Sequence, residues 1–290
     1  MELLVSDSVR KWASESFGEA GELWAGNAVA ELLEFAADRG VTGLSALTGG
    51  RRSLVVSGVL DGDRVVIKSS PDPDEVCARE ALMHWARSGL APQVLGSCGP
   101  HSMFEFVDGA DLSGCDDLVA VTVELAPLVA SAHAEAVTVT KPRTGHIADR
   151  FQVARQRAEL FEHPVLSVSC VDRAEQIAAE LSSGVHLGLL HGDLTPLNVM
   201  RSSAGALKVI DPEPFVGPLG FDLAIWCLRA GLQGEVFDLV DVAADAADVD
   251  AGELLVWART NAVTYGVYCV AFGRSVPEAV LNLAAGIEDV

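Results

Sequence analysis

The order of hydrophobic patterns along the chain restricts its fold more than any other feature. Asp61-Gly62-Asp63 is typical of a β-hairpin turn, and residues 75–88 have the pattern of a helix. Beyond Asp108-Gly109, helical patterns prevail. We therefore expect an α+β protein with a smaller lobe over residues 1–107 and a larger helical lobe over residues 108–290. Short apolar runs typical of strands are concentrated before that boundary, at residues 54–60, 64–68, 93–95 and 102–107.

Two apolar runs inside the helical region lead into polar residues. Residues 187–190 precede a loop that contains Asp193 and Asn198, and residues 207–210 precede Asp211. Two strands joined by a hairpin would bring Asp211 back beside Asn198, whereas Asp193 would stand apart and orient a hydroxyl. Carboxylate and amide oxygens are ligands that suit Mg²⁺. This arrangement is the one that phosphoryl transfer requires.

The smaller lobe contains residues suited to the phosphates of a nucleotide. Lys68 ends an apolar strand, where its ammonium group could reach the α- and β-phosphates. Glu80, on the following helix, could hold Lys68 extended, and Glu75 is the competing partner. The loop that contains Gly50 and Ser53 could cover the phosphates with backbone N–H groups, although a plain turn is the alternative.

A second part of the smaller lobe is suited to the base of a nucleotide. The last predicted strand of that lobe ends at Phe104-Glu105-Phe106-Val107. We expect the backbone of Glu105 and Val107 to form hydrogen bonds with adenine. ATP, or alternatively GTP, is thus the expected phosphoryl donor.

The polar loop also resembles a known family. His191-Gly192-Asp193 with Asn198 five residues after the aspartate, followed by Ile210-Asp211-Pro212, resembles the catalytic segment of aminoglycoside phosphotransferases. The fuller run, from Leu189 to Trp226, is similar to the streptomycin 6-kinase and hydroxyurea phosphotransferase subgroup. The resemblance implies a two-lobed protein-kinase-like fold, with an antiparallel sheet plus helix in the small lobe and a larger helical lobe.

The resemblance also implies a role for each matching residue. Asp193 would be the catalytic carboxylate, Asn198 and Asp211 would hold Mg²⁺, and Lys68 with Glu80 would bind phosphate. His191 and Asp222 would support the catalytic loop without taking part in the chemistry. We assign Glu213 and Trp226 to the acceptor site, with a core position as the alternative for Trp226.

Three positions depart from the pattern of this subgroup. Thr195 stands where His is usual, Leu197 where Gly is usual, and Gly217-Pro218-Leu219 where Gly-Asp-Pro is frequent. None of these residues is an expected metal ligand. The departures therefore leave the kinase chemistry in place and put the identity of the acceptor in doubt.

The charge of the chain restricts its partners. Lys and Arg total 20 and Asp and Glu total 41, which gives a formal net charge of -21. Nucleic acid and anionic membrane surfaces are therefore excluded as main partners. A cationic acceptor fits this balance. The helical repeat of Asp238, Asp241, Asp245 and Asp248 is either a solvated helix face or an acidic wall for such an acceptor.

These observations together predict an ATP-dependent O-phosphotransferase. The expected acceptor is a hydroxyl of a small cationic antibiotic, an aminoglycoside such as streptomycin or a basic peptide such as viomycin or capreomycin, and the expected result is resistance. One alternative is a kinase for hydroxyurea or an uncharged metabolite. Another is a silent, nucleotide-binding pseudokinase that acts through partners. A protein kinase is disfavoured because His-Arg-Asp, Asp-Phe-Gly and Ala-Pro-Glu segments are absent.

Cysteine usage and hydropathy predict where the protein works. The cysteines form no Cys-x-x-Cys pair, so we expect reduced thiols. The N-terminus lacks the pattern of a signal peptide, and no apolar run approaches the roughly 18 residues of a spanning helix. We expect a cytoplasmic protein, monomeric or homodimeric. The six cysteines are Cys77, Cys98, Cys115, Cys170, Cys227 and Cys269.

Overall fold

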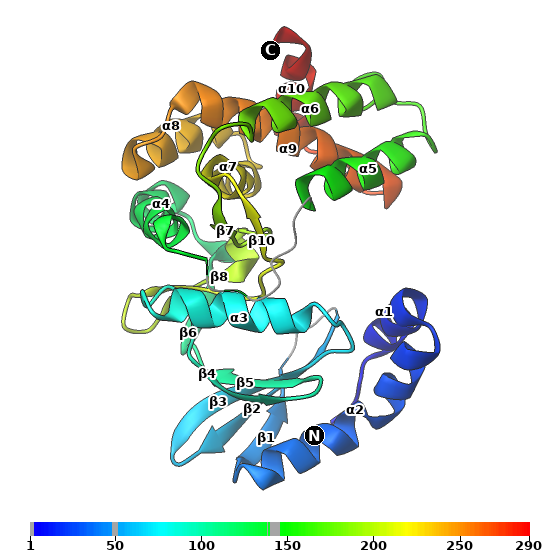
Figure 1. Ribbon diagram of the computed structural model, residues 1–290, viewed down its shortest axis with the longest axis vertical. Coiled ribbons are helices and arrows are strands. Elements are labelled where there is room, and N and C mark those ends of the chain that lie inside the picture. The colour runs from blue at the N-terminus through cyan, green and yellow to red at the C-terminus, as the bar shows by residue number, and fades with distance from the viewer. Residues whose placement is uncertain (1–2, 48–51, 138, 140–145) are drawn as a thin grey trace. The chain divides into compact units, whose positions relative to one another are not determined.

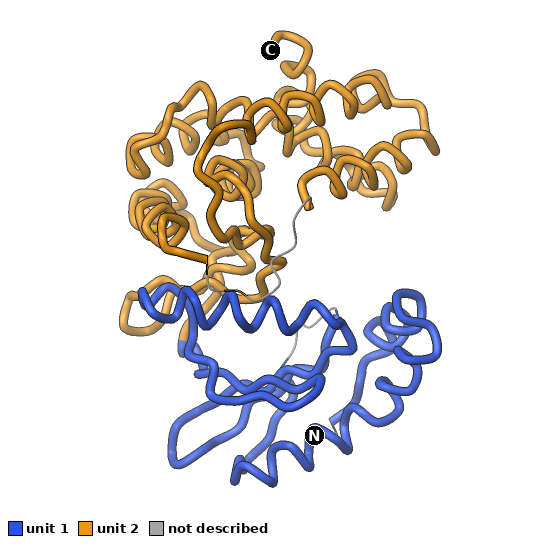
Figure 2. The backbone as a smooth tube through the Cα atoms, in the orientation of Figure 1, with its two compact units in different colours: residues 1–108 blue, residues 109–290 orange. Residues whose placement is uncertain are grey.

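The chain forms two compact units, residues 1–108 and 109–290 (Figure 2). The computed structural model describes residues 3–47, 52–137, 139 and 146–290. The division falls between Asp108 and Gly109, next to the boundary expected from the sequence. Each unit has its own secondary structure.

A five-stranded antiparallel sheet is the centre of the first unit, with strand order β1-β2-β3-β5-β4. The hairpin predicted at Asp61-Gly62 joins β2 to β3, with Leu60 opposite Asp63. Asp61 and Gly62 have φ angles of 53° and 96°, as a two-residue turn of type I′ requires. The strands are β1 (Thr42–Ala46), β2 (Leu54–Leu60), β3 (Asp63–Ser69), β4 (Val94–Cys98) and β5 (His101–Glu105).

Helices α2 and α3 lie on opposite faces of this sheet (Figure 1). Successive side chains of β3 point to these two faces in turn. Val65 and Ile67 are buried in a core shared with α2. On the same face, Trp24 of α2 donates its indole N–H to Ser69 Oγ at 3.1 Å. Lys68 lies on the other face, where it contacts α3. The helices are α1 (Asp7–Phe17), α2 (Glu19–Asp38) and α3 (Glu75–Ala86).

The second unit is mainly helical, as the sequence predicts. Helix α7 is buried along most of its length and packs against α4, α8 and α9. The indole rings of Trp226 and Trp257 are among the largest fully buried side chains. The helices are α4 (Leu118–Ala134), α5 (His146–Ala158), α6 (Val168–Leu181), α7 (Leu219–Ala230), α8 (Val236–Ala247), α9 (Ala251–Ala271) and α10 (Glu278–Ala285), with 3₁₀ turns η1 (Leu112–Gly114), η2 (Pro196–Asn198) and η3 (Gly286–Asp289).

Short strands interrupt these helices and position the polar loops. Strands β7 (Gly188–Leu190) and β10 (Phe215–Gly217) form an antiparallel pair. Strands β6 (Gly109–Asp111), β8 (Val199–Ser202) and β9 (Leu207–Val209) form a separate three-stranded sheet. The apolar runs predicted as strands before His191 and before Asp211 are β7 and β9.

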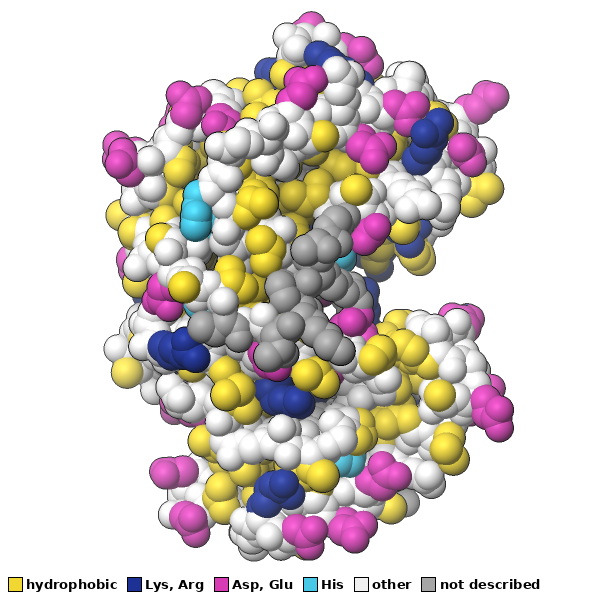
Figure 3. Space-filling view, in the orientation of Figure 1, with side chains coloured by type: hydrophobic (Ala, Val, Ile, Leu, Met, Phe, Trp, Pro, Cys, Tyr) yellow, Lys and Arg dark blue, Asp and Glu magenta, His cyan; other side chains and the backbone are white. Residues whose placement is uncertain are grey.

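The distribution of acidic side chains and the state of the cysteines follow the expectations from the sequence. Acidic side chains are spread over the visible face of each unit (Figure 3). All six cysteines are free thiols, and Cys170, Cys227 and Cys269 are buried. No helix in the described part of the chain is both long and apolar enough to cross a membrane.

Candidate active site

The loop from His191 to Asn198 joins β7 to β8, and its shape depends on Gly192. This residue has a φ of 79°, a conformation that side chains with a Cβ rarely adopt. A Cβ atom at Gly192 would lie 2.1 Å from Glu213 O. The loop also contacts this segment through the N–H of Glu213, which donates to His191 O at 2.9 Å. Only glycine therefore allows the loop to pack so closely on the segment after Asp211.

Asp222 holds the beginning of the same loop. Its carboxylate is 1% exposed, accepts from Gly192 N at 2.9 Å, and also accepts from His191 N. Burial raises the pKa of the Asp222 carboxyl, whereas His191 and these two backbone N–H groups lower it. Asp222 is thus an internal anchor for the loop, in the place where the resemblance puts its supporting residue.

The ring of His191 connects the loop to the segment that carries Asp211. Its Nε2 lies 3.0 Å from Ile210 O, and its Nδ1 lies 3.3 Å from Asp193 N. Burial lowers the pKa of His191, which favours the neutral ring. A neutral ring has one donor and one acceptor nitrogen, and these two contacts use one of each. His191 has a structural role by this geometry.

Asp193 and Asn198 are joined directly. Asn198 Nδ2 donates to the backbone oxygen and to the carboxylate Oδ2 of Asp193, each at 2.9 Å. The expectation that Asp193 stands apart from Asn198 is therefore wrong. The turn η2 between them folds the loop back on itself, with Asn198 N donating to Thr195 O at 2.9 Å. The side-chain oxygen of Asn198 remains for another ligand.

Pairing of β8 with β9 places Asp211 next to Asn198. Val199 is opposite Val209, and Ile210 N donates to Asn198 O at 2.9 Å. Asp211 follows immediately and has a φ of 54°, which turns the chain out of the strand. The hairpin thus brings the backbone of Asp211 next to that of Asn198.

This donor set fits Mg²⁺ bound together with phosphates. Asn198 and Asp211 offer hard oxygen ligands, and Mg²⁺ usually takes one or two such ligands and fills its other positions with water and phosphate. Among the described residues, no group of three or more His, Cys, Asp or Glu is arranged to hold a metal ion alone. The residue types of Asn198 and Asp211 therefore fit a Mg²⁺ ion that is bound jointly with phosphates.

The electrostatic surroundings of Asp193 are mixed. Burial is the main cause that raises the pKa of its carboxyl, and Glu213 raises it further. Arg150, Arg229 and the hydrogen bond from Asn198 lower it. A carboxylate with a raised pKa is a better proton acceptor than an exposed one.

In the first unit, Lys68 forms an ion pair with Glu75. Lys68 Nζ lies 3.0 Å from Glu75 Oε2, and the side chains are only 17% and 13% exposed. Glu75 is the alternative considered from the sequence, and the expected contact with Glu80 stays a prediction. Arg79 Nη1 donates to Ser102 Oγ at 3.1 Å, and Ser102 is opposite Lys68 in the sheet. Sequence reasoning missed this second cation because nothing in the local pattern relates α3 to β5.

The residues expected to contact adenine lie at and just beyond the end of β5. Glu105 N donates to Gln93 O at 2.9 Å, and Gln93 N donates to Glu105 Oε2 at 3.1 Å. In this contact the N–H of Gln93 bonds to the side chain of Glu105 and not to its backbone oxygen. Val107 and Ser53 are buried. Gly50, expected to cover the phosphates, lies outside the described residues.

Trp226 is not an acceptor residue, and that expectation is wrong. The side chain is 1% exposed, and its indole N–H donates to Thr122 Oγ1 at 2.7 Å. The sequence gives no way to distinguish a ligand-binding Trp from a core Trp on an apolar helix. Glu213, in contrast, is 36% exposed at its side chain and lies on the loop that packs against Gly192.

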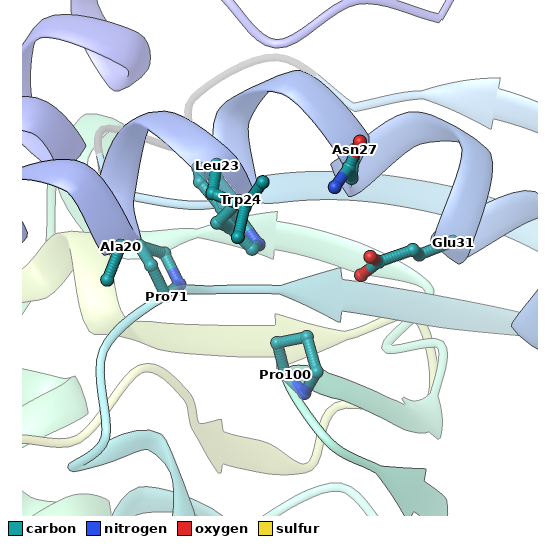
Figure 4. Close-up of a pocket in the computed structure, with 7 residues that line it drawn as sticks. All are labelled: Ala20, Leu23, Trp24, Asn27, Glu31, Pro71 and Pro100. Carbon is teal, nitrogen blue, oxygen red and sulfur yellow. The ribbon is translucent and has the colours of Figure 1, made fainter.

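A separate cavity of about 280 Å³ lies in the first unit (Figure 4). None of the residues predicted to bind nucleotide lines it, and Glu31 is its one titratable side chain. It therefore takes no part in the candidate site. Its lining consists of Ala20, Leu23, Trp24, Asn27, Glu31, Pro71 and Pro100.

The fold and the catalytic loop define a kinase-like phosphotransferase that acts on small molecules. The model of the aminoglycoside/hydroxyurea antibiotic resistance kinase family matches residues 39–273. The chain belongs to this family. The α+β kinase-like fold expected from the sequence is thus confirmed. A comparison with curated protein sequences finds no match.

Solved structures of other kinases share the fold at low sequence identity. A choline kinase from Cryptosporidium parvum Iowa II has a TM-score of 0.65 and 12% identity, covering 90% of this chain and 94% of the other. A macrolide 2'-phosphotransferase from Brachybacterium faecium has a TM-score of 0.60 and 19% identity, with coverages of 90% and 97%. An aminoglycoside phosphotransferase in complex with ADP and hygromycin B has a TM-score of 0.60 and 13% identity, with coverages of 88% and 96%.

Proposed function

We propose that this kinase transfers the γ-phosphoryl group of ATP, or alternatively GTP, to a hydroxyl group of a small antibiotic. The arrangement of Asp193, Asn198 and Asp211 within one loop and one hairpin carries this proposal. Structures of the same fold support the use of a nucleotide, because one of them is an amicoumacin kinase in complex with AMP-PNP, Ca²⁺ and Ami.

In the proposed reaction, Asp193 orients the acceptor hydroxyl and accepts its proton. The hydroxyl oxygen forms a bond to the γ-phosphorus, and the bond from that phosphorus to the β–γ bridging oxygen breaks to release ADP. Asn198 keeps the Asp193 carboxylate in position through its hydrogen bond to Oδ2. Asn198 and Asp211 would hold Mg²⁺, which supplies neutralisation of phosphate charge when bound.

The first unit supplies the groups proposed to bind the nucleotide. Lys68 is held by Glu75 in a largely buried ion pair, so its ammonium group has a defined position. A buried cation fixed in this way suits the phosphates of ATP. The carbonyl of Glu105 and the backbone N–H of Val107 are proposed to contact adenine.

For the acceptor, we propose a cationic antibiotic such as an aminoglycoside or a basic peptide antibiotic. The net charge of -21 and the carboxylate of Glu213 beside the catalytic loop support this choice. One observation favours the alternative of an uncharged acceptor such as hydroxyurea. Arg150 and Arg229 both act on Asp193 electrostatically, so the surroundings of the proposed base also contain positive charge.

The function is tested by measuring ADP release with ATP, Mg²⁺ and a panel of acceptors. The panel contains streptomycin, viomycin, capreomycin, hydroxyurea and uncharged hydroxyl metabolites. Asp193→Asn should reduce kcat by about 10²–10⁴-fold, the range for loss of a general base, with little change in nucleotide affinity. Asp289→Asn, at an exposed position of η3, is the matched control.

Three outcomes separate the alternatives. Release of ADP that depends on a cationic antibiotic supports the proposal in full. Release that depends only on hydroxyurea or an uncharged metabolite keeps the chemistry and overturns the acceptor. Nucleotide binding without turnover for every acceptor would favour a pseudokinase and overturn the catalytic role of Asp193.

A further inference from the structure

Arg150, on α5, contacts three different parts of the candidate site. Its guanidinium group donates to the backbone oxygen of Gly192 and lies 3.4 Å from Glu213 Oε2. The same group lies over the ring of Phe221, 5.4 Å from the centroid. The side chain is only 28% exposed, so these contacts are partly removed from water.

These contacts hold a backbone that has little stiffness of its own. Gly192 adopts a positive φ and immediately precedes Asp193. Asp222 accepts from the N–H of Gly192, on one side of this residue, and Arg150 donates to its carbonyl, on the other side. The peptide that leads into Asp193 is therefore fixed from two independent elements, α7 and α5.

Arg150 also places a positive charge beside the carboxylate of Glu213, on the segment whose backbone packs against Gly192. A planar guanidinium group can donate to a carbonyl and a carboxylate at the same time. The ammonium group of lysine is a point charge on a flexible stem and does not reproduce this geometry.

We propose that Arg150 is a positioning residue that fixes the Gly192 carbonyl and the Glu213 carboxylate, and through them the direction of Asp193. The inference rests on the proposed function, in which Asp193 orients the acceptor hydroxyl. It adds a residue outside the catalytic loop that controls the rate of transfer.

The test compares Arg150→Met, Arg150→Lys and a matched control on the same helix, Arg155→Met. Arg155 is 50% exposed and pairs with Asp172 at 3.4 Å. Arg150→Met should lower kcat by about 10–100-fold, because small misplacements of catalytic groups cost this much. The KM for ATP should change less than about twofold, since nucleotide-binding groups are untouched. Arg150→Lys should recover part of kcat, and Arg155→Met should resemble wild type.

A double-mutant cycle with Glu213→Gln tests the proposed pairing. If Arg150 acts through Glu213 as well as Gly192, the effects on kcat of Arg150→Met and Glu213→Gln are not additive. Unchanged kcat in Arg150→Met would overturn the proposal. So would an equal loss in Arg155→Met, because that loss would report only on the stability of α5.

Hydrogen exchange gives a readout that does not depend on turnover. The amides of residues 191–198 should exchange faster in Arg150→Met than in wild type, and Arg150→Lys should be intermediate. If Arg150→Met does not fold, Arg150→Lys carries the same comparison of kcat and exchange. If the wild-type protein releases no ADP with any acceptor, the proposed function is wrong. If hydrogen exchange of residues 191–198 is unchanged in the Arg150 variants, only the inference about Arg150 is wrong.

Discussion

Asn198 Nδ2 donates to both the backbone oxygen and the carboxylate Oδ2 of Asp193, each at 2.9 Å. The amide oxygen is left for a different ligand. One residue can thus hold the proposed base in position and present an oxygen to a metal ion. The five-residue spacing and the η2 turn make this double role possible.

Replacing Asn198 with Asp should separate these two roles. Asn198→Asp keeps an oxygen for Mg²⁺ but removes both donors and places two carboxylates side by side. We expect kcat to fall by about 10²-fold or more, because the orientation of Asp193 is lost. Steady-state kinetics over a range of Mg²⁺ concentrations provide the measurement. A loss that excess Mg²⁺ fully restores would show that Asn198 acts on the metal alone.

Asp211 should control metal-dependent nucleotide binding. Asp211→Ala removes one of the two proposed protein ligands, so calorimetry with AMP-PNP should show a weak response to Mg²⁺. Mg²⁺ titrated without nucleotide should show no tight binding to the wild-type protein, because the described residues contain no three-member His, Cys, Asp or Glu metal cluster. An unchanged Mg²⁺ response in Asp211→Ala would remove Asp211 from the metal site.

Glu75 and Glu80 can be distinguished by one pair of variants. Glu75→Gln weakens a largely buried contact with Lys68, so it should raise the KM for ATP. Glu80→Gln, on the same helix, is the matched comparison and tests the partner expected from sequence. A larger rise in KM for Glu80→Gln than for Glu75→Gln would restore Glu80 as the partner that matters.

Loss of the Asp222 carboxylate should destabilise the fold. Asp222→Ala leaves the N–H groups of His191 and Gly192 without an acceptor in a buried place. Each unsatisfied buried donor costs about 1–3 kcal/mol, so the free energy of unfolding should fall by several kcal/mol. Urea denaturation measures this loss, with Asp245→Ala as the exposed control. A change below about 0.5 kcal/mol, typical of surface sites, would contradict the anchoring role.

His133 should make stability depend on pH. Its Nε2 lies 3.0 Å from Gly188 N and 2.9 Å from Gly217 O, and burial lowers its pKa. Below its ordinary pKa of about 6.5 the unfolded chain takes up the proton first, so stability is present at higher pH and is lost as pH falls.

The difference between wild type and a variant isolates this contribution. Relative to wild type, His133→Gln should lose most stability at pH 7.5 and less as the pH is lowered below 6.5. Thermal unfolding of both proteins across this range provides the measurement. A constant difference between the two proteins at all pH values would contradict the prediction, because it would mean that the pKa of His133 is the same in the folded and unfolded states.

Local patterns were sufficient to predict several elements. Asp61-Gly62 specifies a hairpin because both positions accept positive φ, and the structure has that turn. The apolar runs before His191 and Asp211 form the short strands β7 and β9. Pairing of β9 with β8, the strand that follows Asn198, brings Asp211 beside Asn198. These features depend on residues close in sequence, where a few backbone angles decide the outcome.

The errors concern side chains whose partners are distant in sequence. The sequence around Trp226 is compatible with either a ligand-binding or a core position. The contact with Thr122 of α4 in the folded protein places it in the core. Arg150 gave no signal at all, because its partners Gly192 and Glu213 follow more than forty residues later.

The sequence by itself determined the kinase-like class, the positions of the catalytic loop and hairpin, and the residue types available for phosphate and metal. The spacing of these residues along the chain determines the local backbone geometry, so the loop and the hairpin can be recognised without knowledge of contacts between distant residues. Only the tertiary structure decided that Glu75 pairs with Lys68, that Asp193 is tied to Asn198, and that Arg150 reaches the loop. Such contacts depend on how helices pack onto strands and loops, and packing is set by the summed burial of many residues.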